Sequence, residues 1–91
     1  MKRDEILSTA AQAVNVDRAA THGNLEDNFA SIAAIWSVRL GVKVTTTQVA
    51  IMFVDLKTVR AWSNPDHADN WVDIAGYAAC GGELSGGTDG E

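Results

Sequence analysis

Apolar side chains recur every three or four residues along most of this chain, which is the spacing of amphipathic helices. The pattern predicts four helices, over about residues 4–18, 25–40, 46–62 and 65–80. Alternation with a period of two is nearly absent outside Val42-Lys43-Val44, so no sheet is expected. We therefore predict an all-α protein, arranged as a compact four-helix bundle.

The two middle helices carry clear end signals. Asn24 is suited to cap the helix that follows it, and Gly41 stands where a left-handed residue commonly ends a helix. Thr45 and Gln48 form a capping box, TTTQ, at the start of the third helix. These positions predict where the second helix begins and ends and where the third begins.

The outer helices have weaker start signals. Asp4 is a good N-cap for the first helix. Asn64 is suited to cap the fourth helix, with Pro65 in its first turn, where a missing N–H costs nothing. A start at Asp66 is an alternative.

Helical periodicity places cations on the apolar faces. At about 100° per residue, Arg60 continues the line of Phe53 and Leu56 on the third helix, and Lys57 borders the same line. Arg18 likewise extends the apolar line of the first helix. Charges on an inward face must be paired or must serve a ligand, because an unpaired buried ion costs several kcal/mol.

A chain reversal at Asn64-Pro65 would set these cations opposite carboxylates. Arg60 would lie level with Asp69, and Lys57 with Asp73, because each pair is nearly equidistant from the turn. Two interpretations remain open: a purely structural ladder of ion pairs, or the floor of a polar binding site.

The number of cations favours the binding site. Arg18 would be a third inward cation, beyond what two aspartates neutralise, and arginine and lysine suit phosphate oxygens. Tyr77 or Trp62 could stack on a base. His22 precedes a helix N-terminus and could contact an anion, and Asn28 lies one turn inside that helix as a further polar candidate.

A metal site competes with this interpretation. Asp69 and Asp73 are one turn apart on one face and could share Mg²⁺. A hydrolytic all-α site usually needs about four carboxylates from two helices, and the second helix offers only Glu26 and Asp27, in its first turn, where acids also complement the dipole. No cofactor is therefore certain, and Mg²⁺ is expected only if the protein is a hydrolase.

Composition limits the domain and its partners. The chain has 91 residues, and we expect one helical domain over residues 1–82 followed by a disordered tail rich in glycine and acid over residues 83–91. A core of roughly eighty residues is small, and the many alanines favour helix contacts between subunits, so we expect a homo-oligomer. The net charge is −5 and no basic stripe exists, which disfavours general binding to DNA or RNA.

The same sequence argues against a disulfide, a membrane-spanning helix and a secretory signal. Cys80 is the only cysteine, so there is no intrachain disulfide. No apolar run approaches about eighteen residues, and the start, MKRDEIL, mixes basic and acidic residues, unlike a secretory signal. We expect a soluble, cytoplasmic protein without a membrane partner.

The residues singled out above also carry a resemblance. The series is Asp17-Arg18, His22-Gly23, Asn28-Phe29, Trp36, Lys57-xx-Arg60 and Asp69-xxx-Asp73-xx-Gly76-Tyr77. Over about residues 5–84 it resembles a family of short phage and prophage proteins of unknown function. That family is similar to the phage nucleotide-modification-associated domain and, distantly, to the MazG-like all-α nucleoside triphosphate pyrophosphohydrolases.

The resemblance implies a nucleotide-related ligand, a phage or prophage origin, hence a bacterial host, and a homo-oligomer in which neighbouring subunits complete the site. MazG-like enzymes hold Mg²⁺ on a glutamate-rich pair of helices. This chain keeps Asp69 and Asp73 in something like the later half of that pattern and lacks the earlier glutamate pair.

Three hypotheses follow. The leading one is a small phage-type protein that binds a nucleotide or nucleotide-derived signalling molecule, with Arg18, Lys57 and Arg60 holding phosphate. The resemblance suggests that it sequesters a host defence messenger. The second is a Mg²⁺-dependent MazG-like pyrophosphohydrolase that uses Asp69 and Asp73. The third is a protein-interaction module whose ion pairs are structural only.

Overall fold

The computed structural model describes residues 1–17 and 24–86. They form α1 (Arg3–Gln12), a π-helical turn η1 (Ala13–Asp17), α3 (Leu25–Leu40), α4 (Thr46–Ser63) and α5 (Ala68–Leu84). The described ranges contain four α-helices and no strand, which confirms the all-α prediction. The predicted site residues Arg18 and His22, and residues 87–91 of the predicted tail, lie outside the described residues.

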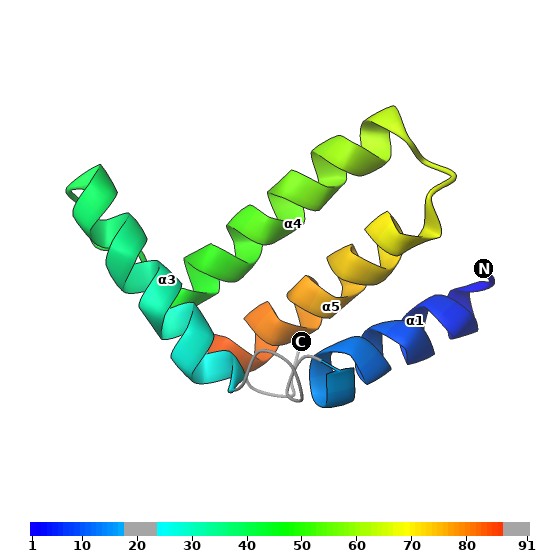
Figure 1. The fold of residues 1–91 in the computed structure, drawn as a ribbon, viewed down its shortest axis with the longest axis horizontal. Helices are drawn as coiled ribbons and strands as arrows, with labels where there is room; N and C mark the ends of the chain where they lie inside the picture. Colours follow the sequence, from blue (N-terminus) through cyan, green and yellow to red (C-terminus); the bar gives the residue numbers. More distant parts are fainter. Residues whose placement is uncertain (18–23, 87–91) are drawn as a thin grey trace.

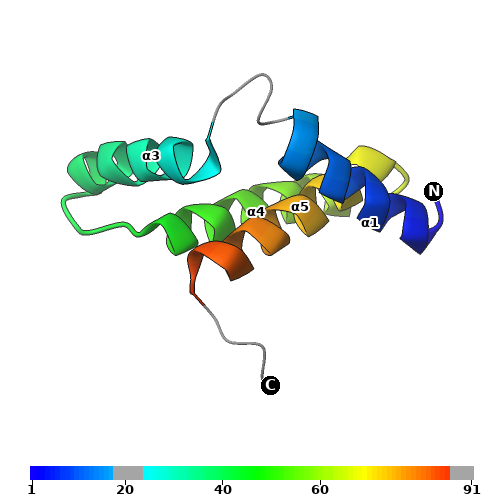
Figure 2. The same ribbon diagram turned by 90° about the horizontal axis from the view of Figure 1, so that it is seen from below.

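The helices are arranged in two layers. α4 and α5 run antiparallel side by side, and α1 and α3 lie on one side of this hairpin (Figures 1 and 2). α3 packs mainly on α4 and α1 mainly on α5, and the two diverge from each other (Figure 1). The arrangement is therefore more open than the compact bundle predicted, because neither α1 nor α3 covers the full length of the hairpin.

The core is small and lies where α3 crosses the hairpin. Phe29 and Val49 are the largest fully buried side chains among the described residues, each 0% exposed. Ala33, Val44, Ala50 and Cys80 complete the buried set around them. Since three of these six side chains are alanine or cysteine, the helices approach closely and bury little apolar area.

The predicted end signals of the middle helices are confirmed. The Asn24 carboxamide oxygen accepts a hydrogen bond from the Asp27 N–H at 3.1 Å. Thr45 and Gln48 satisfy each other's backbone N–H groups at 2.9 and 3.1 Å, as a capping box requires. Gly41 takes the left-handed conformation, with φ at 72°.

The predicted start of the first helix is wrong. α1 begins at Arg3, and its N-cap is Lys2, whose N–H donates to the Glu5 carboxylate at 3.1 Å. Asp4 therefore lies inside the first turn, where its charge still complements the helix dipole. The hydrogen bond that the Glu5 carboxylate accepts from the Lys2 N–H explains why a residue with no N-cap preference holds that position.

The predicted start of the fourth helix is also wrong. α5 begins at Ala68 with His67 at its N-cap. Asn64 and Pro65 instead belong to a turn that His67 closes, because its N–H donates to the Asn64 carbonyl at 3.2 Å. The Trp71 indole N–H also donates to the Pro65 carbonyl, at 2.9 Å. At its other end α5 continues to Leu84, beyond the predicted end at Cys80.

Gly76 allows α5 to approach η1 closely. It is buried, and a Cβ at this position would lie 3.1 Å from Cγ1 of Val14. We expect Gly76→Val to lower the free energy of unfolding by about 1–3 kcal/mol through overpacking. Gly76→Ala should cost less, because alanine gains about 1 kcal/mol of helix propensity. Urea denaturation followed by circular dichroism measures both.

Gly82 provides the matched control, because nothing lies within 4 Å of a Cβ there. Gly82→Ala is expected to stabilise the protein by about 0.5–1 kcal/mol. If Gly76→Val were as harmless as Gly82→Ala, the close packing of η1 on α5 would be contradicted.

Candidate functional site

An ion pair joins the two helices of the hairpin. Nζ of Lys57 on α4 lies 2.7 Å from Oδ2 of Asp73 on α5, and the two side chains are 15% and 28% exposed. This confirms the predicted register, in which Lys57 and Asp73 stand at equal distances from the turn. Because both side chains are largely buried, water screens their attraction less than it would on an open surface.

Aromatic rings adjoin the ion pair on the side towards the core. Phe53 precedes Lys57 by one helical turn and Tyr77 follows Asp73 by one turn, and their rings stack with centroids 4.9 Å apart. Trp36 of α3 meets Phe53 at 5.8 Å in a tilted arrangement. The ring of Tyr77, which was predicted to stack on a ligand, thus already has a partner on one face.

Arg60 does not lie inward, so this prediction is wrong. Its residue is exposed, and within the described ranges no ion pair joins it to Asp69. The turn occupies residues 64–67 and α5 begins only at Ala68, so Asp69 stands at the first turn of its helix. The fourth helix starts later than the prediction required, and the second rung of the predicted ladder does not form.

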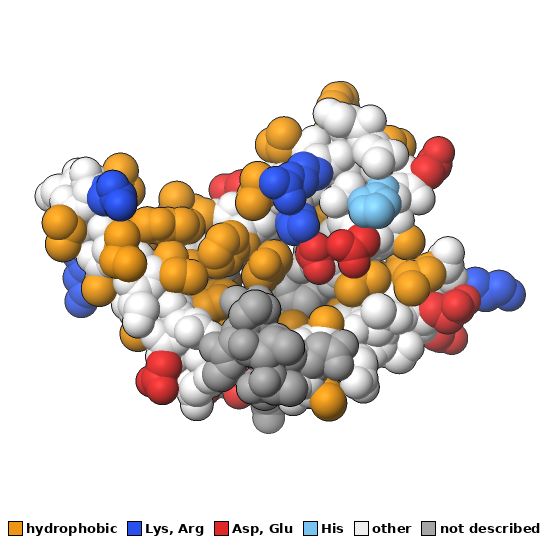
Figure 3. Space-filling model, in the orientation of Figure 1, with side chains coloured by type: hydrophobic (Ala, Val, Ile, Leu, Met, Phe, Trp, Pro, Cys, Tyr) orange, Lys and Arg blue, Asp and Glu red, His pale blue; other side chains and the backbone are white. Residues whose placement is uncertain are grey.

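An open hollow of about 470 Å³ lies at this end of the hairpin. It contains the predicted site residues Lys57, Arg60 and Asp69, and residues that sequence reasoning did not select. The full lining is Lys57, Val59, Arg60, Ser63, Asn64, His67, Asp69 and Asn70. On the molecular surface the Lys and Arg side chains gather beside carboxylates and a histidine, next to an apolar depression (Figure 3).

Two lining residues could have been found from the sequence only with the turn geometry known. His67 occupies the N-cap position of α5 and lines the hollow. Asn70 is buried, 6% exposed, and its amide donates to the Asn64 carbonyl at 3.5 Å. Asn70 therefore holds the turn in place rather than facing a ligand.

Asp69 and Asp73 are too few to form the usual carboxylate site of an all-α hydrolase. Among the described residues, no group of three His, Cys, Asp or Glu is placed to hold a metal ion. Asp73 already pairs with Lys57, and Asp69 is exposed. The two remain the candidate ligands of the Mg²⁺ alternative.

The remaining candidates are spread over the surface. Asn28 is half-buried on α3. Trp62 is 89% exposed on α4. Trp71 on α5 is 45% exposed, and its indole N–H donates to the Pro65 carbonyl.

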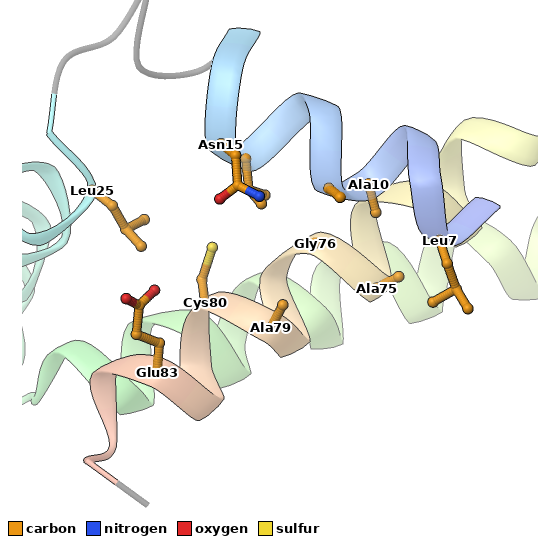
Figure 4. Close-up of a pocket in the computed structure, with 11 residues that line it drawn as sticks. Leu7, Ala10, Asn15, Leu25, Ala75, Gly76, Ala79, Cys80 and Glu83 are labelled. Carbon is orange, nitrogen blue, oxygen red and sulfur yellow. The ribbon is translucent and has the colours of Figure 1, made fainter. Parts of the chain in front are cut away.

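A second cavity, of about 210 Å³, lies between α1, η1 and α5. Asn15, Cys80 and Glu83 point into the same space, and most of the other lining residues are alanines and leucines (Figure 4). The described residues that line it include one carboxylate and no cation. It is therefore poorly suited to a phosphate, and the hollow at Lys57 and Arg60 is the better candidate for an anion.

The fold and site define a small all-helical domain with a polar site on one helical hairpin. The chain belongs to the family described as a domain of unknown function (DUF6378), which matches residues 5–85. Within the described ranges, no helix combines the length and apolar character needed to cross a bilayer. No solved structure matches the chain.

Two relatives are phage proteins, in agreement with the predicted phage or prophage family. The chain is 42% identical over 74 residues to the Gene 55 protein of Mycobacterium phage L5, covering 80% of this chain and 47% of that protein. It is 30% identical over 77 residues to the Gene 55 protein of Mycobacterium phage D29, covering 85% of this chain and 51% of that protein. The chain thus spans about half the length of the curated relatives it matches.

Proposed function

We propose that this protein binds a nucleotide or nucleotide-derived small molecule, with the phosphate held by Lys57 and Arg60. The observation that carries the proposal is the open hollow, which these two cations line from adjacent turns of α4. Within the described ranges only Lys57 has a carboxylate partner. Arg60 is therefore available to make a bidentate contact with phosphate oxygens.

Lys57 is suited to the same ligand. An ammonium group has three N–H donors. The contact with Asp73 uses one of them. Asp73 also holds the side chain in a single orientation, so less entropy is lost when an anion binds. The low exposure of Lys57, 15%, strengthens its attraction for an anion compared with a lysine in bulk water.

The neighbouring rings supply an apolar surface for a base. Trp36, Phe53 and Tyr77 form one aromatic group beside the ion pair, and a base needs a planar contact of this kind. Asp69 and Asp73 carry acceptors that would suit ribose hydroxyls or the amino group of a base. Phosphate and base would thus lie along the hairpin, with the phosphate nearer to the turn.

A binding panel tests the proposal. We expect a thermal shift with one or more members of a set of mononucleotides, cyclic oligonucleotides and ADP-ribose derivatives, measured with and without Mg²⁺. Calorimetry with Arg60→Ala should then show about 10–100-fold weaker affinity, the value of a charge-assisted contact. Because Arg60 is exposed, the variant should fold normally.

Arg39→Ala is the matched control, since Arg39 is an exposed arginine at the end of α3. It should leave affinity unchanged. If no member of the panel shifts the melting temperature, the binding proposal fails and the protein-interaction module is favoured. If a ligand is broken down with release of pyrophosphate, and Asp73→Asn abolishes this, the MazG-like pyrophosphohydrolase replaces simple binding.

The biological part of the proposal is sequestration of a nucleotide-type host defence messenger by a small, cytoplasmic phage protein. It rests on the resemblance to phage nucleotide proteins and on the family membership. We further propose that the protein acts as a homo-oligomer, because thirteen large hydrophobic side chains are exposed among the described residues. Where such side chains form a contiguous patch, the patch commonly marks a contact surface.

A further inference from the structure

The α4–α5 hairpin has an outer face, on the side away from α1 and α3. Residues two positions apart on a helix lie on nearly opposite sides. Phe53, Arg60 and Asp73 lie on the site side. Ile51 is two positions from Phe53, Trp62 is two positions from Arg60, and Trp71 is two positions from Asp73. By the same spacing, the outer face consists of Ile51, Val54, Asp55, Thr58 and Trp62 on α4 and Trp71, Ile74 and Ala78 on α5.

The outer face is apolar and accessible. Ile51 is 54% exposed, Trp62 89% and Trp71 45%. It carries no lysine or arginine, and its one charge is Asp55. The charges of Lys57, Arg60 and Asp73 all belong to the opposite, site side. The two tryptophans of the hairpin thus lie on the side opposite Lys57, Arg60 and Asp73.

We propose that the outer face is the interface of a homodimer, in which two α4–α5 hairpins pack back to back. A two-fold interface must match itself, and an almost uncharged face can do so without repulsion between like charges. Trp62 and Trp71 are residues of the type enriched in such contacts, and Ala78 permits close approach of a partner helix. A membrane surface is the weaker occupant, because the net charge of −5 opposes anionic lipid.

This inference deepens the proposed self-association and does not depend on nucleotide binding. Back-to-back packing leaves the hollow at Lys57 and Arg60 open on the far side of each copy. The two sites are then formed separately within each chain, in contrast to the expectation that neighbouring subunits complete them.

The test is light scattering coupled to gel filtration, with sedimentation over a concentration series. We expect wild-type protein at twice the chain mass of 9.7 kDa. Trp62→Glu should raise the dimer dissociation constant at least about thirtyfold, as expected when a charge replaces a tryptophan that the interface buries. Ile51→Lys provides a second variant on the same face. Circular dichroism shows whether each variant is folded.

Val38→Glu is the matched control, because Val38 is 84% exposed on α3 and lies outside the outer face. It should remain dimeric. Dimers that survive Trp62→Glu and Ile51→Lys would overturn this interface while leaving self-association intact. A monomeric wild-type protein, with or without binding to phosphatidylserine vesicles, would overturn both. Neither result would alter the nucleotide panel, so failure of the two proposals can be told apart.

Discussion

Replacing Phe29 with alanine is expected to lower the free energy of unfolding by about 3–5 kcal/mol. Phe29 is 0% exposed, and its ring lies 5.8 Å from that of Phe53. A domain of this size has only about 3–5 kcal/mol of stability from its core. The variant should therefore be largely unfolded at 25 °C, with the loss of its helical circular dichroism signal.

Two variants show that the effect comes from the core. Phe29→Leu keeps most of the buried volume and should cost clearly less than Phe29→Ala. Ile35→Ala changes a residue of the same helix that is 52% exposed, and it should alter stability by no more than about 0.5 kcal/mol. Equal losses for Phe29→Ala and Ile35→Ala would mean that α3 does not pack through Phe29.

Lys57→Met is expected to have the largest effect on function, with a moderate effect on stability. It leaves Asp73 without its partner, and after a discount for the partial exposure of both side chains we expect a loss of about 1–2 kcal/mol. Removal of the ammonium group should also weaken binding of any nucleotide identified by the panel at least about tenfold. Urea denaturation and calorimetry measure the two effects separately.

Asp73→Asn separates a structural role from a binding role. If Lys57 binds phosphate, both variants lose stability but only Lys57→Met loses most of its affinity. The double variant should lose less stability than the sum of the two single changes, because the pair interacts directly. Lys43→Met, at an exposed lysine, is the matched control and should change neither property. Equal affinity in Lys57→Met and wild type would remove Lys57 from the site.

The positions of the predicted middle helices, and the pairing of Lys57 with Asp73, followed from the sequence because they depend on local rules. Capping at Asn24 and Thr45 involves neighbours three positions away, and the ladder register follows from counting outward from one turn. The start of α5 was missed because His67 and Asn64 close a turn through backbone atoms, which side-chain preferences do not reveal.

Other features were decided by how the helices pack. Periodicity shows which residues share a face of a helix, but it does not show which faces a neighbouring helix covers. Arg60 extends an apolar line and was expected to be inward, yet α3 does not reach that end of α4, and Arg60 is exposed. Tyr77 stacks on Phe53 because the hairpin brings the two rings level.

The sequence by itself thus determined the number of helices, the ends of the two middle helices and one ion pair, because each depends on residues close in the chain or symmetric about one turn. Only the tertiary structure decided that α1 and α3 diverge, that a hollow opens beside Lys57 and Arg60, and that two tryptophans lie on the outer face. These features depend on angles between helices, which distant side chains set together.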